Sequence, residues 1–138
     1  MTDHLSTIIE VPFDDVILET TDALKRHGFG ILTEIDVQAT LKRKLGVDFK
    51  PYKILGACNP QMAYLALQAE DRIGTMLPCN VIVQQREGEQ VEVSAVDPVA
   101  SMMAVENPKL VEAAVEVREM LRQVIEEVGA LRRLKPSA

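Results

Sequence analysis

The residues of this sequence best suited to chemistry are two cysteines, each followed by an asparagine, at Cys58-Asn59 and Cys79-Asn80. Thiols bind soft metals such as Cu(I) and respond to oxidants, so a converging pair would form a soft-metal or redox site that the asparagines orient. Alternatively, unpaired cysteines pack as small hydrophobic residues, while the asparagines cap a helix and a strand end. Because two cysteines are too few for a disulfide scaffold, we expect both thiols to be reduced.

Cys58 is expected to be the more reactive thiol, because it directly precedes a predicted helix. Free amide groups and the helix dipole favour a thiolate at that position. Catalysis by a Cys58 nucleophile is the least supported hypothesis, since no histidine lies near it in the sequence to act as a base. Zinc is poorly supported as well, because structural zinc needs four ligands, and His4 and His27 fit no ligand spacing.

A second candidate region is basic, within a chain that is otherwise acidic. Lys42 opens a run of three basic residues that is followed by two further lysines, at positions 50 and 53. These side chains could bind an anionic small molecule. Such runs on short helices are also typical of a solvated face, and both interpretations stay open. Tyr52, within this region, fits a core residue whose hydroxyl group reaches water.

The known sequence signatures of catalysis are missing from the chain. The segment Gly28-Phe29-Gly30 lacks the third glycine of a dinucleotide-binding loop and does not open a helix after a strand. There is no phosphate-binding loop, nucleophile elbow or paired-histidine helix. Paired carboxylates fall on predicted helix caps or outward faces, where solvation explains them. The sequence therefore identifies no catalytic residue and leaves any cofactor unknown, and we expect a protein that is not an enzyme.

The composition describes one globular domain over residues 1–138, with 47% hydrophobic and 26% charged residues. Acidic residues outnumber basic ones by 21 to 15, a net charge of −6, which argues against nucleic acid as a partner. The longest apolar run, Met62 to Leu67, is far shorter than the roughly 18 residues of a membrane span. The N-terminal segment, with Asp3 and Glu10, does not resemble a secretory signal, so we expect a cytoplasmic protein without membrane association.

Hydrophobic periodicity and turn residues place these candidates on an α+β framework. Asp14 is predicted to cap a first helix, with Phe13 packing on Leu18 as a hydrophobic staple. Asn59-Pro60 and Asn107-Pro108 combine a capping side chain with proline at the first helical position, so each should begin a helix. The pattern predicts strands at 5–11, 30–37, 51–58, 76–86 and 90–96, and helices at 14–27, 39–45, 60–70 and 108 to about 135.

The order of these elements favours a mostly antiparallel sheet covered by the long C-terminal helix over a parallel, doubly wound sheet. Full crossover helices are scarce, and Glu87–Glu89 is predicted to be the turn of a hairpin. In an antiparallel sheet the two cysteines could converge at one edge, whereas a parallel sheet would separate them by roughly 15 Å or more. The apolar stripe of the last helix also fits a coiled coil, but it spans only about three heptads, and we favour packing on the sheet.

Alternation in the second strand places four residues on one face, namely Ile31, Thr33, Ile35 and Val37. Three segments then carry a resemblance to a known family: GFGILTEIDV at 28–37, ATLKRKLGVD at 39–48 and PYKILGACNP at 51–60, extended by LPCNV at 77–81 and AVDP at 95–98. In this order and spacing they are similar to the bacterial family called domain of unknown function 302.

The resemblance implies a small α+β domain of β-α-β(4)-α order, similar to the TATA-box-binding-protein architecture, and a homodimer. It implies no activity and assigns no roles to side chains. The residues that such a family would most plausibly use are the motif positions already described, namely Lys42, Tyr52, Cys58, Asn59, Cys79 and Asn80.

We therefore expect a non-enzymatic module that binds a small-molecule ligand or a partner. Its pocket or dimer surface should lie between the sheet and the helix at 108–131. The alternative is a thiol-based protein in which Cys58 and Cys79 bind a soft metal or respond to oxidants. A structure that placed the two sulfur atoms far apart, or that sealed both of them in apolar packing, would exclude this alternative.

Overall fold

The computed structural model describes residues 4–102 and 105–131. In chain order its elements are β1 (His4–Ile9), α1 (Phe13–Arg26), β2 (Gly30–Asp36), α2 (Val37–Leu45), β3 (Tyr52–Cys58), α3 (Pro60–Ala69), η1 (Asp71–Met76), β4 (Cys79–Gln85), β5 (Val91–Val96), α4 (Pro98–Ser101) and α5 (Pro108–Gly129). This order confirms the predicted α+β class, with short helices inserted between the strands. Within these ranges, no helix is both long and apolar enough to cross a bilayer.

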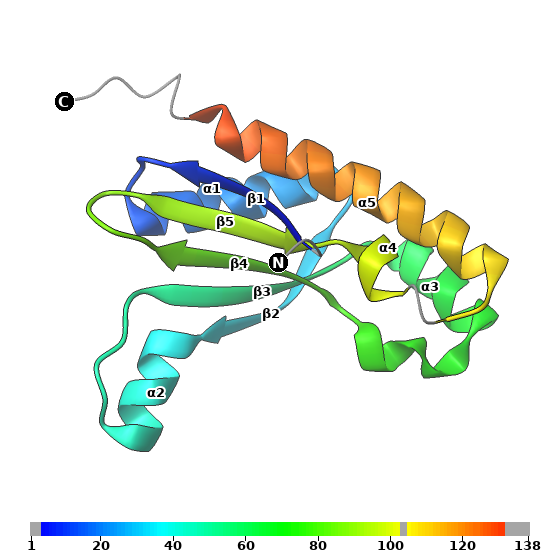
Figure 1. Ribbon diagram of the computed structural model, residues 1–138, viewed down its shortest axis with the longest axis horizontal. Coiled ribbons are helices and arrows are strands. Elements are labelled where there is room, and N and C mark those ends of the chain that lie inside the picture. The colour runs from blue at the N-terminus through cyan, green and yellow to red at the C-terminus, as the bar shows by residue number, and fades with distance from the viewer. Residues whose placement is uncertain (1–3, 103–104, 132–138) are drawn as a thin grey trace.

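The strands of the described residues form one sheet in the order β1-β5-β4-β3-β2. Every neighbouring pair is antiparallel, which confirms the predicted sheet and excludes the doubly wound alternative. Figure 1 shows α1 and α5 on the same side of the sheet, with α5 running along the edge formed by β1. The long helix therefore packs on the sheet, as predicted, and the coiled-coil alternative is not realised.

The main hydrophobic core lies between the sheet and these two helices. Strand residues such as Leu55 and Val83 point into it, and Leu24 of α1 and Leu121 of α5 meet them from the other side. Burying each large apolar side chain contributes about 1.5–3 kcal/mol, so this face dominates the stability. Six buried residues of α5 follow the predicted spacing of four and three, namely Leu110, Ala114, Val117, Leu121, Val124 and Val128, and the buried Ile125 widens this stripe.

The start of α1 differs from the prediction. The helix begins at Phe13 with Pro12 as its N-cap residue, so Asp14 lies in the first turn and does not cap. Leu18 is 65% exposed, whereas Phe13 packs against the main core, so the predicted staple between them is wrong. The proline ring fixes φ at −54° and starts the helix earlier than the capping pattern indicated.

The edge strand β2 does not follow its predicted alternation. A bulge between Ile31 and Thr33 shifts its register against β3, and Ile35 is 47% exposed. Val37 already belongs to α2, because the Asp36 carboxylate accepts a hydrogen bond from a backbone amide of α2 at 2.9 Å and caps the helix. The predicted common face of four alternating residues is therefore wrong.

The connections around β4 and β5 contain two short helices that the sequence did not predict. The fourth strand is predicted from Met76, but η1 ends at that residue and β4 begins only at Cys79. The Leu77–Pro78 peptide bond between them is cis. After β5, the side chain of Asp97 accepts two backbone hydrogen bonds and caps α4. Both short helices lie at the end of the sheet that carries the cysteines.

Candidate functional site

The two cysteines lie at the same end of the sheet. Cys58 is the last residue of β3, and Cys79 is the first residue of β4. Because these strands are antiparallel, Cys79 pairs with Ala57, the residue directly before Cys58. Both cysteines line one pocket that is bounded by this end of the sheet and by α3 and α5. The antiparallel sheet thus brings the two cysteines to one end of the sheet, although alternation directs the Cys58 side chain away from the face that Ala57 and Cys79 share.

This pocket lies where two hydrophobic clusters meet. The main core supplies Phe29 and Val117, and a second cluster around α3, α4 and α5 supplies Met102 and Leu110. Small side chains keep the space open, and its volume is about 40 Å³. The lining is almost entirely apolar and includes a group of alanines, namely Ala57, Ala63, Ala66, Ala113 and Ala114.

Burial keeps both thiols protonated at neutral pH. It raises the pKa of Cys79 to about 11, and the nearby Cys58 adds to this shift. Burial also raises the pKa of Cys58. The loss of solvation opposes the thiolate that the position of Cys58 before α3 favours, and the large rise at Cys79 leaves Cys58 as the more readily ionised of the two thiols. A protonated thiol is a weak nucleophile, so neither cysteine is activated for attack on a substrate.

The two asparagines do not act as a pair. Asn59 lines the pocket, and its Oδ1 accepts a hydrogen bond from the Met62 amide at 3.1 Å, which caps α3 as predicted. The side-chain nitrogen of Asn59 lies so close to Gly28 that a Cβ there would be 3.1 Å away. Asn80 is exposed and pairs with Gly56, outside the pocket. Successive strand residues point to opposite faces, so Asn80 points away from the side that Cys79 faces.

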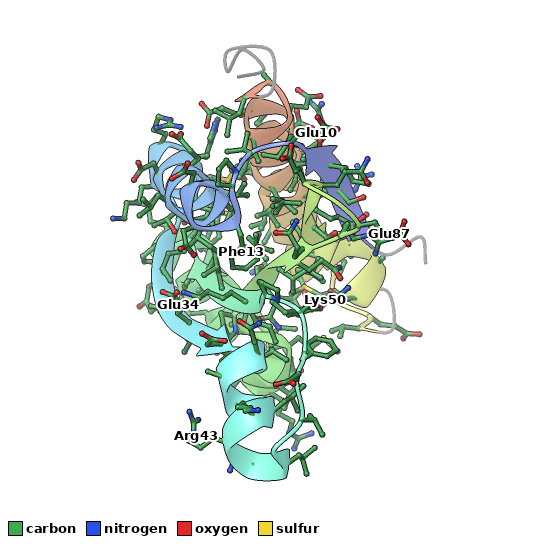
Figure 2. The ribbon with its side chains drawn as sticks, turned by 90° about the vertical axis from the view of Figure 1, so that its left-hand side faces the viewer. Glu10, Phe13, Glu34, Arg43, Lys50 and Glu87 are labelled. Carbon is green, nitrogen blue, oxygen red and sulfur yellow. The ribbon has the colours of Figure 1, made fainter. Side chains whose placement is uncertain are left out.

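Lys42 and Tyr52 lie at the opposite end of the sheet from the cysteines. Tyr52 begins β3, six residues before Cys58, which corresponds to about 20 Å along the strand. Lys42 belongs to α2, which projects away from the sheet at the end that faces the viewer in Figure 2. Tyr52 is half-buried, and its ring lies 6.2 Å from that of Phe49. The six predicted site residues are therefore divided between two distant regions.

The basic region at this second end is largely engaged with polar partners. The Lys42 ammonium lies 2.9 Å from the Asp48 carboxylate, and Lys53 lies 2.8 Å from Glu34. Lys50 donates a hydrogen bond to a glutamine side chain of β4 at 2.7 Å. Lysine side chains that already have polar partners attract an added anion less strongly. These contacts therefore support the interpretation that the basic region is a solvated face.

Comparison with known proteins agrees with this architecture. The family model described as "Domain of unknown function DUF302" matches residues 5–128. The chain belongs to this family. The crystal structure of an uncharacterized conserved DUF302 protein from Bacillus stearothermophilus resembles 93% of this chain and 99% of its own, with 28% sequence identity and a TM-score of 0.85. None of the curated proteins matches the chain.

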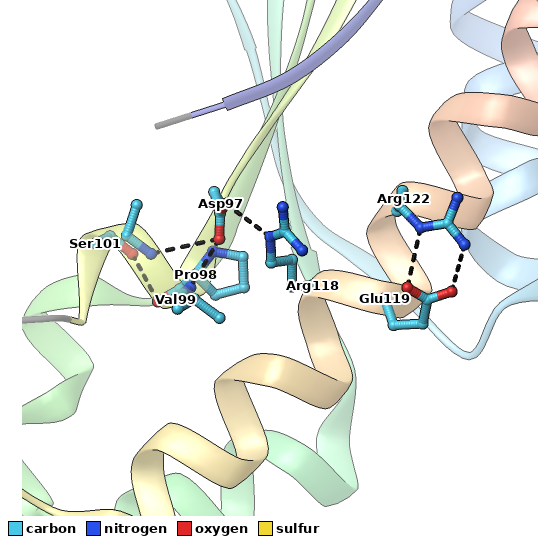
Figure 3. A network of polar contacts seen from close by, with 8 residues as sticks. Asp97, Pro98, Val99, Ser101, Arg118, Glu119 and Arg122 are labelled. Atoms are coloured by element: carbon cyan, nitrogen blue, oxygen red, sulfur yellow. Dashed lines mark hydrogen bonds and ion pairs between the residues drawn. The ribbon is translucent and has the colours of Figure 1, made fainter. Parts of the chain in front are cut away.

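The outer side of the pocket in this DUF302 domain depends on two residues that the sequence analysis did not select. One carboxylate oxygen of Asp97 caps α4, and the other accepts a hydrogen bond from Nε of Arg118 on α5 at 2.8 Å (Figure 3). These contacts hold α4 against α5, so that Pro98 and Met102 line the pocket. The pair Asp97-Pro98 has the same cap-and-proline pattern as Asn59-Pro60, and this signal could have predicted α4.

Two methionines also line the pocket of the DUF302 domain, Met62 on α3 and Met102 directly after α4. No sequence pattern singles them out, because methionine within apolar segments is normally a core residue. Among the described residues, no group of three or more histidine, cysteine, aspartate or glutamate side chains is placed to hold a metal ion.

Proposed function

We propose that this DUF302 domain is a non-enzymatic binding module whose ligand site is the pocket at the cysteine end of the sheet. The observation that carries the proposal is an apolar lining that contains two thiols kept protonated by burial. Among the described residues that line the pocket, none is a histidine, carboxylate, lysine or arginine. Acid–base catalysis needs such groups within reach of a substrate, so the site is suited to binding and not to a reaction.

The size of the pocket limits the ligand. Its volume of about 40 Å³ exceeds the roughly 10–15 Å³ that one water molecule needs, and it is well below the roughly 150 Å³ of a cavity that binds benzene. A ligand that stayed charged would lose its hydration without gaining polar partners. The proposed ligand therefore has few atoms and forms an uncharged complex with the lining.

Xenon is a suitable probe for this site, because it is apolar, monatomic and enters dry cavities. We expect xenon pressure to shift the NMR resonances of the alanines that line the pocket. The substitution Ala63→Leu adds carbon atoms to the space and should abolish these shifts. Ala39→Leu, at an exposed position of α2, is the matched control. Equal shifts in the wild type and in Ala63→Leu would refute the proposed site.

A natural ligand is sought by native mass spectrometry of the gently purified full-length chain. We expect an added mass on the wild type and on Ala39→Leu that is missing from Ala63→Leu. A wild-type protein that shows only the bare chain mass, and whose resonances do not respond to xenon, would argue against a binding module.

A thiol-based function is the second candidate, and one observation favours it. Both cysteines line the same pocket, and Cys58 adds to the rise in the pKa of Cys79 that burial causes. Intact-mass analysis after mild peroxide treatment tests the redox form of this idea. The loss of two hydrogens would indicate an oxidised pair, whereas single oxygen atoms that peptide mapping places on the cysteines, and not on the methionines, would contradict a redox pair.

A further inference from the structure

The face of the sheet opposite the main core, here called the outer face, carries a row of side chains of graded size. Successive strand residues alternate between the two faces, so the residues between the core positions point to the outer face. The strand register aligns one of them from each strand, in the order Ser6, Ser94, Ile82, Ile54 and Ile35. Ile35 is 47% exposed, and the other two isoleucines are half-buried. The row is therefore small at its β1 side and large and apolar at its β2 side.

An arm formed by α2 and the loop after it, residues 37–50, continues this apolar surface at one end of the sheet. No residue of α2 is buried, and Leu45 is 69% exposed. The ring of Phe49 lies 6.2 Å from that of Tyr52, which belongs to the outer face. In Figures 1 and 2 the arm projects from the sheet on the side away from α5. Short helices gain most of their stability from tertiary packing, so this arm needs a partner surface.

Charge is divided unevenly at the same end of the sheet. The arm carries four basic residues and one acidic residue, a net charge of +3: Lys42, Arg43, Lys44, Lys50 and Asp48. The opposite corner, made by residue 10 and residues 86–92, carries four acidic residues and one basic residue, a net charge of −3: Glu10, Glu87, Glu89, Glu92 and Arg86. Figure 2 shows Arg43 far from Glu10 and Glu87. Arg43 and Lys44 have no acidic partner among the described residues.

We propose that a second copy of this chain packs on the outer face, related by a two-fold axis parallel to the strands. The central strand of the sheet is β4, so the axis passes along it and places β2 of each copy over β1 of the other. Ile35 then faces the partner's Ser6, and Ile54 faces the partner's Ser94. Large side chains thus meet small ones, as a well-packed interface requires, and Ile82 lies at the axis against its own copy.

The same rotation brings the opposite charges together. An axis parallel to the strands does not exchange the two ends of the sheet, so each basic arm reaches the acidic corner of the other copy. A net charge of +3 therefore meets −3 twice in one symmetric dimer. An axis perpendicular to the strands would set isoleucine on isoleucine and serine on serine, and would leave each arm at the end away from the acidic corner. Only the first arrangement is complementary in both size and charge.

The dimensions of the outer face suit such a contact. Strands of six or seven residues, roughly 4.8 Å apart, present a face of roughly 500 Å² in a five-stranded sheet. The two arms add to this area, and a standard interface buries about 800 Å² of each partner. None of the residues in the row or the arm lines the pocket at the cysteine end. The interface is therefore separate from the proposed ligand site and goes beyond the binding function.

Sedimentation equilibrium of the full-length chain tests the packing of the two outer faces. Ile82→Lys places two like charges at the axis and should weaken dimerisation about a hundredfold or more. Val115→Lys, at a position of α5 that is 54% exposed, is the matched control and should dimerise like the wild type. Urea unfolding verifies that both variants are folded. A wild type that stays monomeric at all concentrations, or Ile82→Lys that dimerises as tightly as the wild type, would overturn the proposal.

Charge reversal tests the contact between arm and corner. One variant combines Arg43→Glu with Lys44→Glu, and a second combines Glu87→Lys with Glu89→Lys. Each variant alone sets like charges against each other in its own homodimer, so each should dimerise about tenfold or more weakly at low salt. In an equal mixture, the acidic arm of the first variant meets the basic corner of the second, and the unaltered arm and corner also meet. The mixture should therefore form a heterodimer.

The control for this pairing changes the same number of charges elsewhere. Glu112→Lys with Glu116→Lys, at exposed positions of α5, should dimerise like the wild type and should form no heterodimer in preference with the arm variant. If the mixture of arm and corner variants stays as weakly associated as each variant alone, the arm does not bind the corner. An equal loss in the control would attribute the effect to net charge and would overturn the proposed contact.

Discussion

The carboxylate of Asp97 is the best place to test how the pocket is held together. Its side chain is only 12% exposed, and it accepts hydrogen bonds from the amides of Val99 and Ala100 at 3.0 and 3.3 Å. Nε of Arg118 donates to its second oxygen at 2.8 Å (Figure 3). One side chain thus caps α4 and ties it to α5, and two substitutions can separate these contributions.

Asparagine is as good an N-cap residue as aspartate, so Asp97→Asn should keep the cap and lose the charge of the pair. Because Arg118 is 44% exposed, this loss should cost about 0.5–1 kcal/mol. Asp97→Ala also removes the cap, which adds about 0.5–2 kcal/mol. We therefore expect a total cost of about 1–3 kcal/mol for alanine.

Urea unfolding of the wild type and the two variants measures these costs. The reactivity of Cys58 and Cys79 with a thiol reagent is followed in parallel, because a displaced α4 should open the pocket. We expect faster thiol reaction in Asp97→Ala than in Asp97→Asn. If alanine costs no more than asparagine, and the thiol rates are equal, the cap does not hold α4 and the reasoning is wrong.

The same pair predicts a pH dependence. Burial by itself would raise the pKa of Asp97, but hydrogen bonds from Arg118 and from two backbone amides lower it overall, below the ordinary 3.8. A carboxyl group with a lowered folded-state pKa stabilises the fold above its unfolded-state pKa and loses this contribution as the pH falls through the folded-state value. The wild type should therefore exceed Asp97→Asn in stability by the full contribution of the ion pair at pH 7. This difference should disappear once the pH is below the folded-state pKa of Asp97. A stability difference between the two proteins that stays the same from neutral to acidic pH would contradict the ion pair.

Three further predictions concern the fold and its assembly. Leu121→Ala should cost about 2–5 kcal/mol in urea unfolding, because this side chain is fully buried in the core, whereas Val115→Ala, at a position 54% exposed, should cost little. Gly56→Ala should cost about 1–3 kcal/mol, because the new Cβ would overlap Oγ1 of Thr33 and lie 2.8 Å from the Pro78 ring; Gly74→Ala, with no atom within 4 Å, should be nearly neutral. The family resemblance predicts a homodimer, so sedimentation should give a molecular mass twice the 15.3 kDa of one chain. The mass of a monomer at all concentrations would contradict this prediction.

The sequence predicted those parts of the fold that local patterns determine. The stripe of α5 follows directly from apolar residues at helical spacing, and the Asn107-Pro108 pair marks its start. To predict that Cys58 and Cys79 lie at one end of the sheet required one further inference. This was the antiparallel order of the strands, which the hairpin between β4 and β5 indicates. Where two local patterns competed, as at Pro12 and Asp14, the backbone restriction of proline decided the outcome.

The pocket itself could not be predicted, because it depends on distances between segments that are remote in the chain. Met62, Met102 and Leu110 reach one space only after α3, α4 and α5 have packed together. The same packing raises the pKa of the Cys58 thiol, which is opposite to the direction expected from its position in the sequence. Its place before a helix favours a thiolate, but the burial that opposes the charge comes from tertiary contacts that no local pattern describes.

The alanines around the pocket are too small to fill the space between the two hydrophobic clusters. Larger side chains at Ala63 or Ala113 could fill it, and the cost of leaving about 40 Å³ empty is roughly 1 kcal/mol. That cost is small against the total stability of a domain but large enough to be measured. If Ala63→Leu raises the stability and abolishes binding, the space is not required for folding. Its small lining residues and its sulfur atoms are then best explained by an occupant.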